Sequence, residues 1–166
     1  KINDPKNETI EYWEQIKNVG IPGAKVYPED FVYIAVRDLE KPENYLINKY
    51  GMGFITTEEV KKMGATKAAQ EALKMLEHCD LIYVSFDVDS IDSRFSTGTG
   101  TPVPNGLTVE EAKELNEELA LSPKLCAWEI VEVNPTLDTE NRMAESAFEI
   151  MEATARNIAS RSVPQE

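Results

Sequence analysis

The sequence predicts an α/β fold built on a mainly parallel sheet. Short runs of β-branched and aromatic residues alternate with longer helix-forming segments, a pattern typical of βαβ units. The most apolar run, residues 81–86, lacks polar alternation, which indicates a strand covered on both faces. The 166 residues suffice for one domain core and hardly for two. Right-handed crossovers would lay helices over the sheet and gather the strand ends along one rim.

Each expected element has a local reason. Strands are expected, from their β-branched and aromatic content, at residues 31–36, 53–55, 81–86 and 125–133. Helices are expected at residues 11–19, 42–50, 56–63, 65–77, 108–120 and 140–160. Pro42 suits the first turn of its helix, and Thr56 with Glu59 and Thr108 with Glu111 form two capping boxes.

Composition excludes several classes of function. The formal net charge of -13 disfavours binding to nucleic acid or to an anionic membrane surface. The apolar runs are too short to span a bilayer, and no signal peptide is visible. Cys79 and Cys126 form no CxxC motif, so neither a disulfide scaffold nor a zinc ribbon is indicated and a cytoplasmic location is expected. The only histidine, His78, sits beside a helix end and is assigned no role.

Two acidic residues stand where the most apolar strand ends. Strand geometry places Asp87 and Asp89 on one side, with their carboxylates a few ångströms apart. Two such carboxylates repel each other, and a divalent cation such as Mg²⁺, Ca²⁺ or Mn²⁺ would remove that repulsion. Capping of the next loop is the simpler interpretation. The position at the carboxyl end of a buried strand, where open α/β sheets bind ligands, favours a metal site.

Two other acidic patterns fit less well. An EF-hand loop needs a glycine at its sixth position, where this chain has Asp92. A haloacid-dehalogenase-type phosphotransferase would need a downstream acidic pair, which we do not find. Arg37 and Glu132 also follow expected strands, so both are expected near the rim that carries Asp87 and Asp89.

Three segments together resemble a known family. They are Ser-Phe-Asp-Val-Asp-Ser-Ile-Asp at residues 85–92, Gly-Thr-Gly-Thr-Pro at 98–102 and Glu-Ile-Val-Glu-Val-Asn-Pro at 129–135. Their order and spacing resemble the metal-binding signatures of the ureohydrolases, which comprise arginase, agmatinase, formimidoylglutamase and relatives. The resemblance extends over about residues 31–160.

The resemblance implies a three-layer α/β/α fold with a mainly parallel sheet, here incomplete, and a pair of manganese ions at the strand ends. Carried over by position, Asp87 would bridge both ions and Asp89 would chelate one. Glu132 would bind the substrate's guanidinium, and Thr101 would lie close to the pocket. A metal-bound hydroxide would hydrolyse a guanidino C–N bond.

The chain also departs from the family pattern. Ser90, Ser93 and Glu129 replace residues that are commonly Gly, Pro and Asp in the family. Two metal ions need more ligands than Asp87 and Asp89 provide, and the family's further Asp and His ligands and its proton-relay His have no match here. We therefore expect residues 1–166 to be the C-terminal portion of a single ureohydrolase domain. Alone, this portion would hold no catalytic residue of its own and would be inactive.

Hydrolysis of L-arginine to L-ornithine and urea is the favoured reaction, because Arg37-Asp38-Leu39-Glu40 and Glu132-Val133-Asn134-Pro135 are most like arginase. The alternatives are an agmatinase, a formimidoylglutamase or a non-catalytic metal-binding or assembly subunit. The expected ligand is a small cationic guanidino compound. The resemblance also implies a homo-oligomer, either a trimer or a hexamer.

Overall fold

A computed structural model describes residues 5–161. The strands are β1 (Val32–Ile34), β2 (Gly53–Ile55), β3 (Ile82–Asp87) and β4 (Leu125–Val131). The helices are α1 (Asn7–Lys17), α2 (Lys41–Tyr50), α3 (Thr57–Met63), α4 (Ala65–Met75), α5 (Val109–Ala120) and α6 (Arg142–Ser160). Two 3₁₀ turns, η1 (Pro28–Asp30) and η2 (Val88–Ser90), flank β1 and β3. The predicted strands and helices are therefore confirmed, with small shifts at their ends.

Three helices begin at side-chain caps. The hydroxyl of Thr56 accepts the Glu59 N–H at 3.1 Å, and the Glu59 carboxylate accepts the Thr56 N–H at 2.7 Å. Thr108 and Glu111 repeat this arrangement at the start of α5. Helix α6 begins differently, because the Asp138 carboxylate accepts two backbone N–H groups of its first turn, each at 3.0 Å.

All the strand pairs are parallel, as predicted, but the strands form two separate sheets. β1 pairs with β2 and β3 pairs with β4. Among the described residues, β1 and β3 therefore each keep one edge without a strand partner. A cavity of about 550 Å³ lies between these strands, with α4 and α5 also contributing to its lining. The sheet is thus interrupted between β1 and β3.

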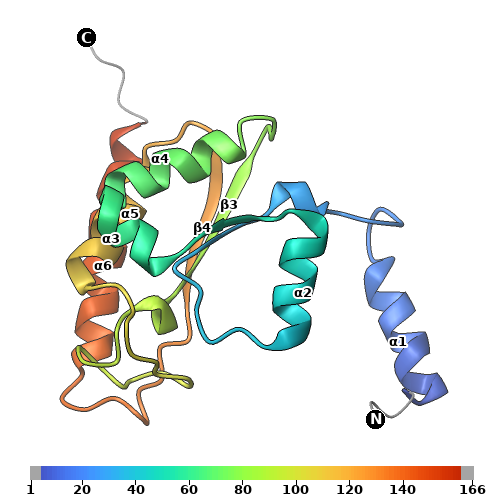
Figure 1. Cartoon of the computed structure of the whole chain (residues 1–166), viewed down its shortest axis with the longest axis horizontal. Helices are drawn as coiled ribbons and strands as arrows, with labels where there is room; N and C mark the ends of the chain where they lie inside the picture. Colours follow the sequence, from blue (N-terminus) through green and yellow to red (C-terminus); the bar gives the residue numbers. More distant parts are fainter. Residues whose placement is uncertain (1–4, 162–166) are drawn as a thin grey trace.

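The core lies between the strands and a layer of helices. α4 packs against α5 and α5 against α6, and α3 adjoins α4 (Figure 1). The first two helices differ, because α1 and α2 contain no buried residue and α2 stands apart from the packed helices in Figure 1. Helix α4 contacts both β1 and β2, whereas α2 forms the connection between these two strands.

The expectation that β3 is covered on both faces is wrong for the described residues. Ile82 and Phe86 are buried, whereas Leu81 is 67% and Tyr83 56% exposed. The helix layer covers one face of β3, and no element among residues 5–161 covers the face that carries Tyr83. None of the described helices is long and apolar enough to cross a lipid bilayer.

Candidate metal centre at the strand rim

The acidic pair meets at the carboxyl end of β3, though not by strand alternation. Asp87 is the last strand residue, and Asp89 lies in the η2 turn that follows. Asp87 Oδ1 accepts the Asp89 N–H at 2.8 Å, which turns the chain immediately after the strand. The expectation that strand alternation places both carboxylates on one side is wrong, because Asp89 lies in the 3₁₀ turn and its N–H caps on the Asp87 side chain. The Asp89 carboxylate is near enough to raise the pKa of Asp87.

Two threonines hold the Asp89 carboxylate. The hydroxyl of Thr99 lies against Asp89 Oδ1, and the hydroxyl of Thr101 lies against Oδ2. Thr99 is buried, and its hydroxyl also lies 2.9 Å from the carbonyl oxygen of Glu132, so it links the ends of β3 and β4. Thr101, predicted to lie near a substrate pocket, contacts Asp89 and also lines the cavity between β1 and β3. Sequence reasoning missed Thr99, and the only signal was its place in the Gly-Thr-Gly-Thr stretch.

Glu132 follows β4 in an unusual backbone conformation. Its φ is 68°, in the left-handed region that a residue with a long side chain rarely adopts. Such strained residues cluster at functional sites. A Cβ on Gly100 would lie 3.6 Å from Glu132 Oε2, so the 98–102 loop runs directly past this carboxylate. Glu132 is exposed and carries its charge to the same rim as Asp89.

The rim has an excess of negative charge. Burial raises the pKa of Asp87, and the Asp89 and Glu132 carboxylates raise it further. The Asp89 N–H and the Arg37 guanidinium oppose this rise without cancelling it. A divalent cation beside Asp87 would supply the missing positive charge, and carboxylate oxygens suit manganese. The residues present therefore fit one side of a manganese site.

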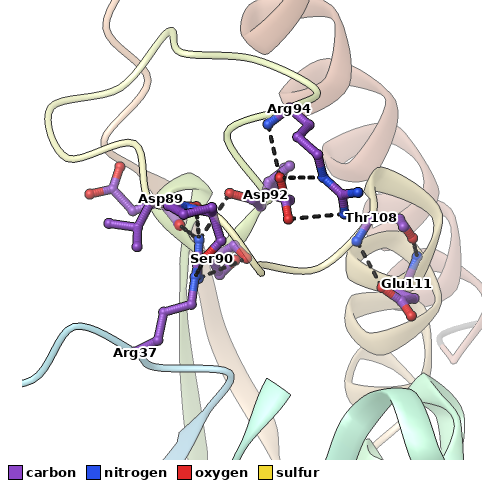
Figure 2. Close-up of polar contacts among 10 residues, drawn as sticks. Arg37, Asp89, Ser90, Asp92, Arg94, Thr108 and Glu111 are labelled. Atoms are coloured by element: carbon purple, nitrogen blue, oxygen red, sulfur yellow. Dashed lines mark hydrogen bonds and ion pairs between the residues drawn. The ribbon is translucent and has the colours of Figure 1, made fainter. Parts of the chain in front are cut away.

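Arg37 lies at the rim as predicted, but it binds the backbone of the loops (Figure 2). Its guanidinium Nη2 donates to the carbonyls of Asp89 at 2.9 Å and Val103 at 2.8 Å. Further bonds reach the carbonyls of Ser90, Ile91 and Pro104. A Cβ on Gly106 would stand 2.6 Å from Arg37 Nη2, so a glycine is needed where the guanidinium passes. Arg37 thus ties the acidic turn to the following loop.

The third acid of the motif is structural. Asp92 is fully buried, and both of its carboxylate oxygens pair with the Arg94 guanidinium, at 2.9 and 3.1 Å (Figure 2). The Arg94 side chain and backbone N–H lower the pKa of Asp92 to about 2. Asp92 therefore stabilises the loop, and its carboxylate is not free to bind a ligand at the rim.

Asp87 and Asp89 do not make a complete metal site by themselves. Among the residues the structure describes, only Asp30, His78 and Cys79 bring three candidate ligand atoms within 4.8 Å of one another. That trio lies away from the rim. Two carboxylates at the rim can hold a cation loosely, and tight binding of two ions requires further ligands.

Comparison with known proteins identifies relatives of this chain. The Arginase family model matches residues 16–155. The arginase of Brevibacillus brevis is 37% identical over 139 residues, which cover 83% of this chain and 47% of that protein. The crystal structure of Helicobacter pylori arginase matches at a TM-score of 0.84 and 26% identity, over 95% of this chain and 52% of that one. The crystal structure of Entamoeba histolytica arginase in complex with L-ornithine matches at a TM-score of 0.74 and 30% identity. The match covers 78% of this chain and 44% of that one.

These matches define the class of protein. The fold is that of the ureohydrolases, and the acidic rim occupies the ends of its parallel strands. The chain belongs to the arginase family. It spans about half the length of the curated relatives it matches.

Proposed function

We propose that this chain is the C-terminal portion of a single arginase-family domain, and that the complete protein hydrolyses a guanidino C–N bond. The favoured reaction converts L-arginine to L-ornithine and urea. The observation that carries the proposal is the convergence of Asp87, Asp89 and Glu132 at one rim, in a chain whose family relatives are arginases.

Each rim residue has a distinct task in this proposal. Asp87 and Asp89 would hold two manganese ions together with ligands from the rest of the domain. The ions would supply Lewis acidity and an activated water at neutral pH. Glu132 would accept hydrogen bonds from the guanidinium, a charge-assisted contact that fixes the substrate's orientation. Thr99 and Thr101 would keep the Asp89 carboxylate in one rotamer, as outer hydrogen bonds do at metal sites.

The interrupted sheet supports the fragment interpretation. β1 and β3 run parallel to their partners and border the same cavity of about 550 Å³. A strand from the rest of the domain would pair with both free edges and join the two sheets. Its carboxyl end would then reach the rim between Arg37 and Asp87, where further ligands are needed. Additional helices would cover the exposed face of β3 at Tyr83.

The test is urea release by the full-length, manganese-loaded protein. L-Arginine, agmatine, guanidinobutyrate and formimidoylglutamate are supplied separately, and urea and formamide are both measured. Arginase predicts urea from L-arginine at a kcat/KM well above that for the other three. Urea from agmatine alone would refute arginase, and formamide from formimidoylglutamate would identify that relative. No release from any of the four would favour a non-catalytic metal-binding or assembly subunit.

The expected oligomeric state and cellular location rest on the same resemblance. A homo-oligomer, trimeric or hexameric, and a cytoplasmic location are part of the proposal. Helix α1 exposes Trp13 and Ile16, each by more than 60%, which gives a second subunit or the rest of the domain apolar surface to cover. Sedimentation of the full-length protein distinguishes a monomer from these assemblies.

A further inference from the structure

A second group of metal-ligating side chains lies at the opposite end of the strands. Asp30 ends the η1 turn just before β1, and His78 and Cys79 follow α4 just before β3. His78 Nε2 lies 3.0 Å from Asp30 Oδ1. Cys79 Sγ lies 3.8 Å from the same oxygen and 3.5 Å from His78 Nε2. Asp30 is separated by 48 and 49 residues from His78 and Cys79, which are neighbours in the α4–β3 connection.

These separations are close to those of a tetrahedral zinc site. Zinc binds nitrogen and oxygen at about 2.0–2.2 Å and sulfur at about 2.3 Å. A tetrahedron with those bond lengths has N···O edges of about 3.4 Å and edges to sulfur of about 3.6 Å. The observed triangle, with sides of 3.0, 3.5 and 3.8 Å, therefore approximates one face of such a tetrahedron. An ion above that face would leave a fourth position for water.

A backbone N–H and a lysine side chain support the two segments that carry the three groups. Asp30 Oδ2 accepts the Tyr27 N–H at 2.9 Å, which fixes the carboxylate and leaves Oδ1 facing His78. Lys124 Nζ donates to the carbonyls of Glu77 at 2.6 Å and Cys79 at 2.8 Å, so the turn before β3 is clamped. Half of the His78 side chain and a quarter of the Asp30 side chain remain exposed, so an ion can enter from solvent.

The charges nearby are consistent with a thiol that a cation would ionise. Burial and the Asp30 carboxylate raise the pKa of Cys79, while the Lys124 ammonium acts to lower it. The Tyr27 N–H and His78 lower the pKa of Asp30. A divalent ion would stabilise the Cys79 thiolate beside that carboxylate, and the thiol proton would pass to solvent.

We propose that Asp30, His78 and Cys79 bind a zinc-class divalent ion as a structural clip between the segment before β1 and the turn before β3. The mixed oxygen, nitrogen and sulfur donors favour Zn²⁺ or Co²⁺ over the harder Mn²⁺. Asp87 lies at the far end of β3, about 17 Å along the strand, so this site is separate from the rim. The ion would join β1 and β3, the two strands between which the sheet is interrupted.

The test is a Co²⁺ titration of the full-length, metal-free protein under reducing conditions. Thiolate ligation to Co²⁺ gives a near-ultraviolet charge-transfer band, which oxygen ligation at the rim does not give. The proposal predicts this band at one equivalent per chain and its loss when Zn²⁺ is added. Cys79→Ser abolishes the band, and His78→Gln and Asp30→Asn weaken Co²⁺ binding by at least about tenfold.

Matched variants separate this site from the others. Cys126→Ser changes the other cysteine, which is exposed on β4, and keeps the full band. Asp87→Asn also keeps it, so the result is independent of the proposed hydrolase activity. Circular dichroism of each variant checks that its fold is retained. Absence of the band in the wild type, or a band that survives Cys79→Ser, would overturn the proposal.

Discussion

The two ends of the parallel strands carry different chemistry. The carboxyl ends bring together Asp87, Asp89 and Glu132, which offer only carboxylate oxygens. The amino ends bring together Asp30, His78 and Cys79, which offer one oxygen, one nitrogen and one sulfur. Oxygen ligands select hard ions such as manganese, whereas a nitrogen and a sulfur select zinc. One short fold thus presents two sets of donor atoms with opposite metal preferences.

The two ends also differ in completeness. The amino-end trio already has three ligand atoms within 4.8 Å, and all three belong to this chain. At the rim, burial raises the pKa of Asp87, and the Asp89 and Glu132 carboxylates raise it further. A site that is assembled from several parts of a sheet depends on every strand of that sheet, whereas a site between neighbouring loops does not. The first three changes below should affect the rim and leave the amino-end trio intact, and the fourth tests the stability of the loop beside the rim.

The largest effect is expected from Asp87→Asn in the full-length protein. The change removes the charge of a carboxylate that we propose as a metal ligand, so urea release from L-arginine should fall by about 10³-fold or more. The measurement is steady-state urea production with saturating Mn²⁺. Asp80→Asn removes an exposed acid before β3 and is the matched control, with activity within about twofold of the wild type. Near-normal activity of Asp87→Asn would contradict the assigned role.

Glu132→Gln should have the next largest effect. The change removes a charge-assisted hydrogen bond to the guanidinium, worth about 1.5–3 kcal/mol, so kcat/KM should fall by about 10–100-fold. Manganese affinity should hardly change, because Glu132 is assigned to substrate. Parallel measurement of kcat/KM and of the Mn²⁺ dissociation constant tests this separation. A loss of manganese with unchanged kcat/KM at saturating metal would assign Glu132 to the ions.

Thr99→Val should weaken manganese binding by about tenfold, because it removes a hydroxyl that orients Asp89. Thr97→Val is the matched control, since Thr97 is exposed in the same loop. The Mn²⁺ dissociation constants of the two variants are compared by titration of the metal-free protein. Equal constants would mean that the contact between Thr99 and Asp89 serves only the packing of the loop.

The smallest effect on activity is expected at Asp92, whose role is stability. Its folded-state pKa of about 2 lies below the usual 3.8, so the stabilisation is present above about pH 4 and is lost as pH falls through 2. Asp92→Asn should therefore lower the free energy of unfolding at pH 7 and flatten its dependence between pH 4 and 2. A stability profile that matches the wild type would contradict the structural role.

The sequence predicted the elements and the rim well. Capping boxes and apolar runs identify local structure, so α3, α5 and β3 were found, and β3 led to Asp87. Thr99 was missed because its contact with Asp89 depends on how an irregular loop folds back. His78 was assigned no role because Asp30 is 48 residues away. The interruption between β1 and β3 has no local sequence signal, since strand pairing is decided by the whole sheet.

The central claim is that the rim becomes a manganese centre only when the rest of the domain completes it. Metal analysis of the full-length protein and of residues 1–166 alone, after dialysis against Mn²⁺ and gel filtration, tests this most directly. The account predicts two manganese ions per full-length chain and no tightly held manganese on residues 1–166. Two ions held tightly by residues 1–166 alone would contradict it.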